Sequence, residues 1–200
     1  MNDEHGFGWP TKGDRAFVPT GDGYVFDLYH MDQSYINRPE AFKRAADMIL
    51  DQLAKSKNRP YWNELFFPVA YLYRHYLELR LKVIVRSGLV LGSLAKSEKL
   101  NDALSQHKLE QLWRFARTVL EARWPGARTD ELETVQKIVR EFHGVDPSGE
   151  KLRYEESKGS KRHSYPTLPI EINIPKLRET MDGVSNFLEA TSSELTEGQQ

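Results

Sequence analysis

The sequence contains no cysteine, which excludes disulfide bridges and thiolate metal sites. Because a cysteine-free chain suits a reducing compartment, we expect a cytoplasmic protein. An excess of either charge is lacking too, since 28 Lys and Arg residues stand against 29 Asp and Glu residues. A chain so balanced has no general attraction for duplex DNA, and only a local basic patch could bind nucleic acid.

Long apolar runs are also absent. No segment approaches the roughly 20 apolar residues that a membrane-spanning helix requires, so we expect no membrane contact. The first residues, MNDEHGFGWP, contain no apolar region typical of a signal peptide. The motifs GxGxxG, GxSxG and HExxH and the phosphate-binding loop do not occur, and the six histidines lack the spacing of metal ligands on a helix. We therefore predict neither a cofactor nor a metal site.

Amphipathic segments make up most of the chain. Apolar residues recur every three or four positions in five segments, residues 41–55, 60–87, 107–123, 129–143 and 175–190. This pattern predicts an all-α helical bundle of about five helices within residues 38–190, and Gly88 is expected to end the second helix. Residues 191–200 are expected to form a flexible tail.

The segment 1–37 has a different composition. It combines frequent glycines with several aromatic residues, so we expect an irregular N-terminal arm that packs on the body. The stretch YVFDLY at 24–29 is a candidate for a short strand in this arm. A disordered segment is the alternative interpretation.

The stretch YRHYLELRLK at 73–82 places charged residues within the second helix. Arg74, Glu78 and Lys82 are four positions apart and therefore lie in one row, here called the polar row, with His75 beside it. One interpretation is a solvent-exposed set of i,i+4 ion pairs, each worth about 0.2–0.5 kcal/mol. The other is a functional site in which the polar row and His75 contact a ligand or a partner.

Arg80 falls outside the polar row, among apolar positions of the same helix. A buried guanidinium is strongly destabilising unless it is paired. We therefore expect a carboxylate partner or an interface for Arg80, with Asp47, Glu141 and Asp146 as candidate partners.

Histidines near two other helix ends are further candidates. His107 opens the third helix and either caps its N-terminus or faces the polar row across a helix pair. Arg140 and His143 lie one turn apart at the end of the fourth helix, with Asp146 beyond. A histidine there also interacts favourably with the helix C-terminus, so a structural role is the alternative to a functional one.

A basic loop, KLRYEESKGSKRH at 151–163, follows the fourth helix. Lys151, Arg153 and Tyr154 bring two cations and an aromatic ring together, a combination suited to phosphate and base contacts. The alternative is a loop that is only solvated.

Three stretches together resemble the bacterial branch of the HEPN superfamily: LYRHYLELRLKVIV, then HKLEQLW, then IVREFHGVDPSGEKLRY. The resemblance extends from about residue 40 to about residue 190. It implies a bundle of four or five helices, frequently a homodimer, from toxin–antitoxin and phage-defence systems, whose active members are metal-independent ribonucleases. Those members use an arginine and a histidine separated by four to six residues. This chain has no such pair, and its nearest pairs are Arg74-His75 and Arg140 with His143.

The resemblance implies a HEPN-like protein of a defence or toxin–antitoxin system. It would bind RNA or a nucleotide, or act as a degenerate ribonuclease partner beside an antitoxin or another defence protein. One alternative is an active ribonuclease with a non-standard pair, and another is a non-enzymatic dimerisation module with the polar row as its interface. The candidate catalytic residues are Arg74, His75, Glu78, Arg140 and His143, with His75 or His143 as base and Arg74 or Arg140 on phosphate. The candidate nucleic-acid contacts are Lys82, His107, Lys151, Arg153 and Tyr154.

Overall fold

A computed structural model describes residues 10, 12–17, 34–56, 62–154, 156–157, 161–162, 168–169 and 171–197. The chain divides into two units, Met1–Ser34 and Tyr35–Gln200. In the first unit the described residues include a turn at Lys12 and Gly13, and Gly13 has a φ of 104°. The strand expected at 24–29 lies outside the described residues.

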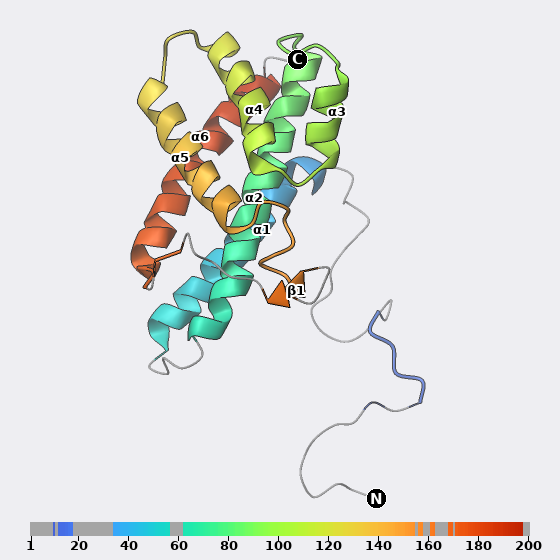
Figure 1. Cartoon of the computed structure of the whole chain (residues 1–200), viewed down its shortest axis with the longest axis vertical. Coiled ribbons are helices and arrows are strands. Elements are labelled where there is room, and N and C mark those ends of the chain that lie inside the picture. Colours follow the sequence, from blue (N-terminus) through green and yellow to red (C-terminus); the bar gives the residue numbers. More distant parts are fainter. Residues whose placement is uncertain are drawn as a thin grey trace, which may run out of the picture. The chain divides into compact units, whose positions relative to one another are not determined.

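The second unit is helical, which confirms the all-α prediction (Figure 1). Its helices within the described residues are α1 (Ser34–Lys55), α2 (Trp62–Val90), α3 (Glu98–Ser105), α4 (Leu109–Arg123), α5 (Thr129–Val145) and α6 (Ile174–Glu197). Between α5 and α6 a short antiparallel pair is formed by β1 (Glu156–Ser157) and β2 (Lys161–Arg162), with Glu156 opposite Arg162.

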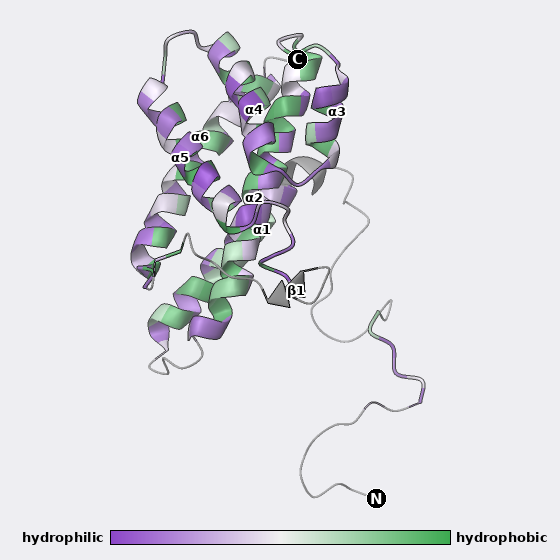
Figure 2. Cartoon of the chain, in the orientation of Figure 1, coloured by the Kyte–Doolittle hydropathy of each residue, from purple (hydrophilic) through white to green (hydrophobic). Residues whose placement is uncertain are grey.

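The central element is α2, which packs against α4 and α6, while α5 and α3 pack on α4. Its apolar arc is fully buried and includes Tyr73, Tyr76, Leu77, Leu81 and Ile84. Burial of one leucine or isoleucine side chain contributes about 1.5–3 kcal/mol, so this arc anchors the bundle. Figure 2 shows the expected division, with apolar residues on the helix faces that meet and polar residues on the outer faces.

The start of the first helix, the end of the last helix and one additional helix differ from the sequence prediction. The first helix begins at Ser34 and not at residue 41, so it includes Pro39. An additional helix, α3, occupies the segment that we expected to be a connection, and Ser97 caps it by accepting a hydrogen bond from the Leu100 amide at 3.2 Å. The last helix continues to Glu197, with Leu195 buried, so residues 191–197 are helix and not a flexible tail.

Gly88 does not end α2, which continues to Val90. A Cβ atom on Gly88 would lie 2.2 Å from Cγ2 of Val119 on α4. This glycine is therefore required by the close approach of α2 and α4, and not by a helix stop.

None of the helices within the described residues is both long enough and apolar enough to cross a bilayer.

Candidate functional site

The polar row of α2 forms the expected i,i+4 ion pairs between Arg74 and Glu78 and between Lys82 and Glu78, but the row is buried and not exposed to solvent. Arg74 and Glu78 are each 1% exposed and Lys82 is 9% exposed. The row faces the segment that connects α3 to α4 and the loop that follows α5, because Arg74 hydrogen-bonds to His107 and to Asp146 in these two segments. Charges in such a place are stable only when each is paired.

Arg74 joins three parts of the chain. Its Nε donates to the backbone carbonyl of Asp146 at 3.0 Å, and its Nη2 donates to the carbonyl of His107 at 2.6 Å. Its Nη1 donates to Oε2 of Glu78 at 3.3 Å, and the Asp146 carboxylate lies 3.5 Å from Nε. All three guanidinium nitrogens are therefore occupied within the protein, and Arg74 fixes the position of the two segments that cross α2.

Besides Arg74, the carboxylate of Glu78 contacts two side chains, Lys82 and His107. Its Oε1 accepts a hydrogen bond from Nζ of Lys82 at 2.8 Å and lies 2.8 Å from Nδ1 of His107. Burial by itself would raise the pKa of Glu78, but the hydrogen bonds and positive charges of Lys82 and His107 outweigh burial and hold the pKa below its usual value. Glu78 is therefore a carboxylate at neutral pH.

His107 is the exposed end of this network. Its side chain is 52% exposed, and it faces the polar row across the helix pair, which is one of the two positions expected from the sequence. It does not cap α4, because the N-cap position belongs to Lys108. Nδ1 is turned to a carboxylate, so Nε2 is directed away from Glu78, and in the neutral ring it can accept a hydrogen bond.

Asp146 anchors the loop that follows α5. Its buried carboxylate accepts hydrogen bonds from the amides of Glu150 at 2.9 Å, Lys151 at 3.1 Å and Leu152 at 3.5 Å. Gly149 in the same loop has a φ of 79°, and a Cβ atom there would lie 3.0 Å from both Nη1 of Arg74 and Cβ of His107. The sequence DPSGEKL predicts a turn, but the role of Asp146 as its anchor was not anticipated.

A cation–aromatic group lies beside this loop. The guanidinium carbon of Arg153 is 5.7 Å from the ring centroid of Tyr71 and 5.3 Å from that of Tyr154. Nε of Arg153 donates to the carbonyl of Gly149 at 2.8 Å, so this group is continuous with the His107 segment. Arg153 and Tyr154 are exposed, as a ligand contact requires.

His75 is held between aromatic rings. Its ring stacks on Tyr71 at 5.7 Å and meets Phe42 edge-to-face at 4.4 Å. Burial lowers the pKa of His75, and although the negative charge of Glu78 opposes this effect, the positive charges of His107 and Arg74 add to it, so the pKa lies below the usual value. His75 is therefore a neutral, packed ring at the edge of the site.

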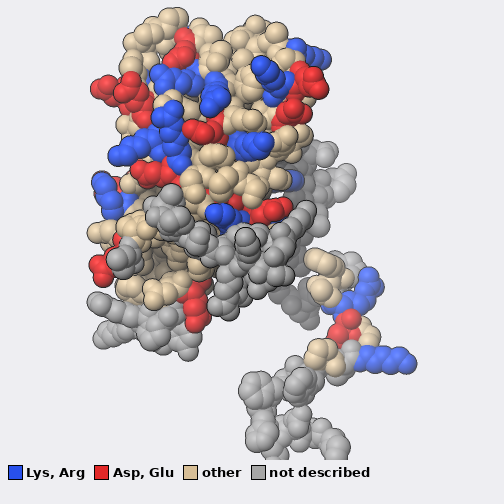
Figure 3. All heavy atoms as spheres, viewed as in Figure 1, with Lys and Arg blue, Asp and Glu red and all other residues tan. Residues whose placement is uncertain are grey.

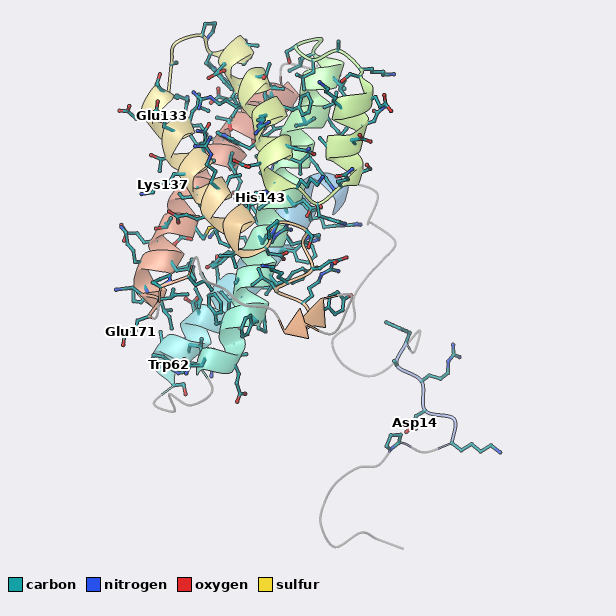
Figure 4. The ribbon with its side chains drawn as sticks, in the orientation of Figure 1. Asp14, Trp62, Glu133, Lys137, His143 and Glu171 are labelled. Atoms are coloured by element: carbon teal, nitrogen blue, oxygen red, sulfur yellow. The ribbon has the colours of Figure 1, made fainter. Side chains whose placement is uncertain are left out.

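Arg140 and His143 form a second group on α5. Nε of Arg140 donates to Oε1 of Glu110 at 3.2 Å, and Nε2 of His143 lies 3.9 Å from the other oxygen of this carboxylate. His143 lies in the last turns of α5 (Figure 4), and burial lowers its pKa. Its Nδ1 is buried and has no hydrogen-bond partner among the residues that the structure describes. The pair thus contacts α4, and the positive charge of Arg74 acts on His143 through space.

Arg80 is paired with a carboxylate that was not among the expected candidates. Its partner is Glu40 on α1, and its Nη1 also donates to Oγ of Ser192 on α6 at 3.1 Å. Asp47 instead accepts from Tyr73 at 2.8 Å, and Asp146 belongs to the network around Arg74. Arg80 thus has the carboxylate partner that its burial predicts, and it joins α1, α2 and α6 within the chain.

The structure therefore brings together most of the expected residues in one place, here called the His107 site. The His107 site consists of a buried layer with Arg74, Glu78, Lys82 and Asp146 and an outer layer with Tyr71, His75, His107, Arg153 and Tyr154. Arg140 and His143 lie on α5 beside it. Among the described residues no group of three His, Asp or Glu side chains is placed to hold a metal ion.

The chain was compared with protein-family models, with curated proteins and with solved structures, and none of them matches it.

Proposed function

We propose that the chain is a HEPN-like protein that binds single-stranded RNA at the His107 site. The observation that carries this proposal is the exposed imidazole of His107, held by the buried Glu78 next to the Arg153–Tyr71–Tyr154 group. Arginine and aromatic side chains at a surface suit a phosphate and an unstacked base, respectively.

The charge distribution favours a local contact. On the face shown in Figure 3, lysines and arginines alternate with acidic residues among the described parts of the chain. Such a surface does not attract a duplex along its length, whereas a flexible strand can reach a small group of cations and rings.

The experiment is fluorescence anisotropy with a labelled uridine oligonucleotide of about 12 residues, titrated at several salt concentrations. We expect Arg153→Ala and Tyr154→Ala each to weaken binding by about tenfold, the equivalent of about 1.4 kcal/mol. Arg114→Ala on the exposed surface of α4 is the matched control and should leave binding unchanged. If Arg153→Ala and Arg114→Ala have equal effects, the proposed site is excluded.

A second candidate function is metal-independent cleavage of this RNA, and the contact between Glu78 and His107 favours it. A histidine that is oriented by a carboxylate can remove the proton of a ribose 2′-hydroxyl, whose oxygen then attacks the adjacent phosphorus and expels the 5′-oxygen. In this proposal His107 takes the role that the sequence suggested for His75 or His143. Arg74 is a positioning residue, because its nitrogens are occupied within the protein.

Cleavage is tested with RNA in the presence of EDTA. A 2′,3′-cyclic phosphate product that disappears in His107→Ala and persists in His143→Ala would support it. If the RNA stays intact at high protein concentration, cleavage is excluded and only the binding proposal remains. The same proposal includes a homodimer, which sedimentation of the purified chain tests. It also includes an antitoxin or defence partner, which the identity of the neighbouring genes tests.

A further inference from the structure

A groove with a volume of about 840 Å³ opens between α5, α6 and the first half of α2. Its floor is apolar and includes Phe66, Ile138, Phe142, Leu177 and Met181. A concave apolar surface of this size is typical of a binding site. The His107 site does not contribute to its lining.

On the rim of the groove, acidic side chains without an ion-pair partner among the described residues outnumber such basic side chains. Glu133, Glu141 and Glu171 have no ion-pair partner among the described residues, and Lys137 is the one rim cation there without one. The other two rim cations are engaged elsewhere, Arg140 with Glu110 at 3.2 Å and Lys176 with Glu179 at 3.0 Å. Figure 4 shows Glu133 and Lys137 projecting from the outer side of α5, with Glu171 near the start of α6.

The groove is elongated. Its lining on α5 runs from Glu133 to Val145, which corresponds to about 18 Å or three helical turns. On α6 it continues from Lys176 to Met181, so two helices form its walls. A slot of this shape matches the apolar face of a helix better than a compact small molecule.

We propose that this groove binds an amphipathic helical segment of a partner protein that carries apolar side chains flanked by lysines or arginines. The apolar side chains would enter the floor between Phe142 and Leu177. The basic side chains would meet Glu133 and Glu141 on one wall and Glu171 on the other. This inference does not rest on RNA binding, because the groove and the His107 site are lined by different residues.

The experiment uses a fluorescein-labelled peptide of leucine, alanine and lysine, about 14 residues or four turns long, with its leucines on one helical face. A matched peptide carries glutamate in place of lysine. We expect saturable one-to-one binding of the lysine peptide and no saturable binding of the glutamate peptide. The double variant Glu133→Gln with Glu141→Gln should bind about fivefold more weakly, the effect of losing two exposed ion pairs.

Two further variants distinguish binding in the groove from attraction by the net charge of the protein. Glu98→Gln with Glu131→Gln removes two exposed carboxylates outside the groove, and it should leave the affinity unchanged. Thr180→Trp fills the groove without changing a charge and should abolish binding, while circular dichroism verifies that the helices persist.

Three outcomes would overturn the proposal. The first is equal weakening by the two carboxylate double variants, which would indicate attraction by net charge. The second is binding that survives Thr180→Trp. The third is a homodimer that Thr180→Trp dissociates, because the occupant would then be a second copy of this chain.

Discussion

Glu78 and His107 form a contact between a buried carboxylate and an exposed imidazole, with 2.8 Å between Oε1 and Nδ1. A carboxylate at this distance accepts a hydrogen bond from Nδ1 and so favours the tautomer in which Nε2 carries the lone pair. Glu78 is itself held by Arg74 and Lys82. The orientation of the exposed ring is thus determined by charges inside the bundle.

The first prediction concerns this tautomer. In the neutral form of the ring, nitrogen-15 correlation spectra of the imidazoles should show the proton of His107 on Nδ1 and the lone pair on Nε2. Glu78→Gln offers Nδ1 a side chain that can also donate, so the preference should be lost and both tautomers should be populated. The ring of His75, which contacts Phe42 and Tyr71, should keep its tautomer and serves as the internal control. A mixture of His107 tautomers already in the unmodified protein would contradict the contact.

Arg74→Met should strongly destabilise the fold. The substitution removes the donor to the backbone carbonyls of Asp146 and His107 and one of the cationic partners of the Glu78 carboxylate. Breaking a buried charge pair in this way costs about 3–5 kcal/mol. Urea unfolding followed by circular dichroism measures this loss, and Arg114→Met on the exposed surface of α4 should cost no more than about 0.5 kcal/mol. Equal effects of the two substitutions would mean that Arg74 does not join the crossing segments.

Gly149→Ala and Gly126→Ala form a matched pair. Both glycines have positive φ values, 79° and 72°, and a side chain in this conformation costs about 1–2 kcal/mol. A Cβ atom on Gly126 meets no atom within 4 Å, whereas one on Gly149 lies 3.0 Å from both Arg74 and His107. The loss of unfolding free energy in Gly149→Ala should therefore exceed that in Gly126→Ala, and only Gly149→Ala should weaken RNA binding. Equal losses would show that the loop can move away from Arg74.

The long helices were predictable because their apolar spacing is regular and each buries one stripe on α2 or α4. The additional helix, Glu98–Ser105, has only eight residues, which is too short for periodicity to distinguish it from a connection. The last helix was expected to end early because Thr191 and Ser192 are polar. Both are nevertheless buried, since Thr191 Oγ1 donates to the carbonyl of Phe187 at 2.9 Å and Ser192 accepts from Arg80.

The burial of the polar row could not be predicted from the sequence, for a related reason. Helical spacing tells which residues share a face, but not which segment covers that face. Arg74 is covered by His107, 33 residues away, and by Asp146, 72 residues away. Neither separation follows from a local pattern. The proximity of His107 to the row was one of two open alternatives, and only the fold selects it.

The free energy of unfolding should fall on mild acidification. Burial lowers the pKa of both His75 and His143, so the folded state favours their neutral forms. Their contribution is therefore complete above the ordinary histidine pKa of about 6.5 and is lost as the pH falls through the lower pKa values of the folded state. Glu78 does not contribute in this window, because its pKa is also lowered and its stabilisation is lost only in stronger acid.

The measurement is the urea midpoint between about pH 7.5 and pH 5, the range in which histidines titrate. His75→Phe and His143→Phe should each reduce the slope of stability against pH, because a phenyl ring fills the site and cannot take up a proton. A slope that is unchanged in the double variant would assign the pH dependence to other groups.

Gly88→Ala should destabilise the contact between α2 and α4. The added methyl group would lie 2.2 Å from Cγ2 of Val119, and overpacking of this kind costs about 1–3 kcal/mol. Gly183→Ala on α6 is the matched control, because a Cβ atom there meets nothing within 4 Å. It should stabilise the protein by about 0.5–1 kcal/mol, the ordinary advantage of alanine in a helix.

The cause of the Gly88→Ala effect can be isolated with a double variant. In the background of Val119→Ala the closest obstructing methyl group is gone and only Leu94 and Ser93 at 3.2 Å remain near the added Cβ, so Gly88→Ala should cost less in urea unfolding. The difference between the two backgrounds is then the energy of the collision itself. If Gly88→Ala costs the same in both backgrounds, the two helices do not meet at this position and the packing of α4 against α2 described above would be incorrect.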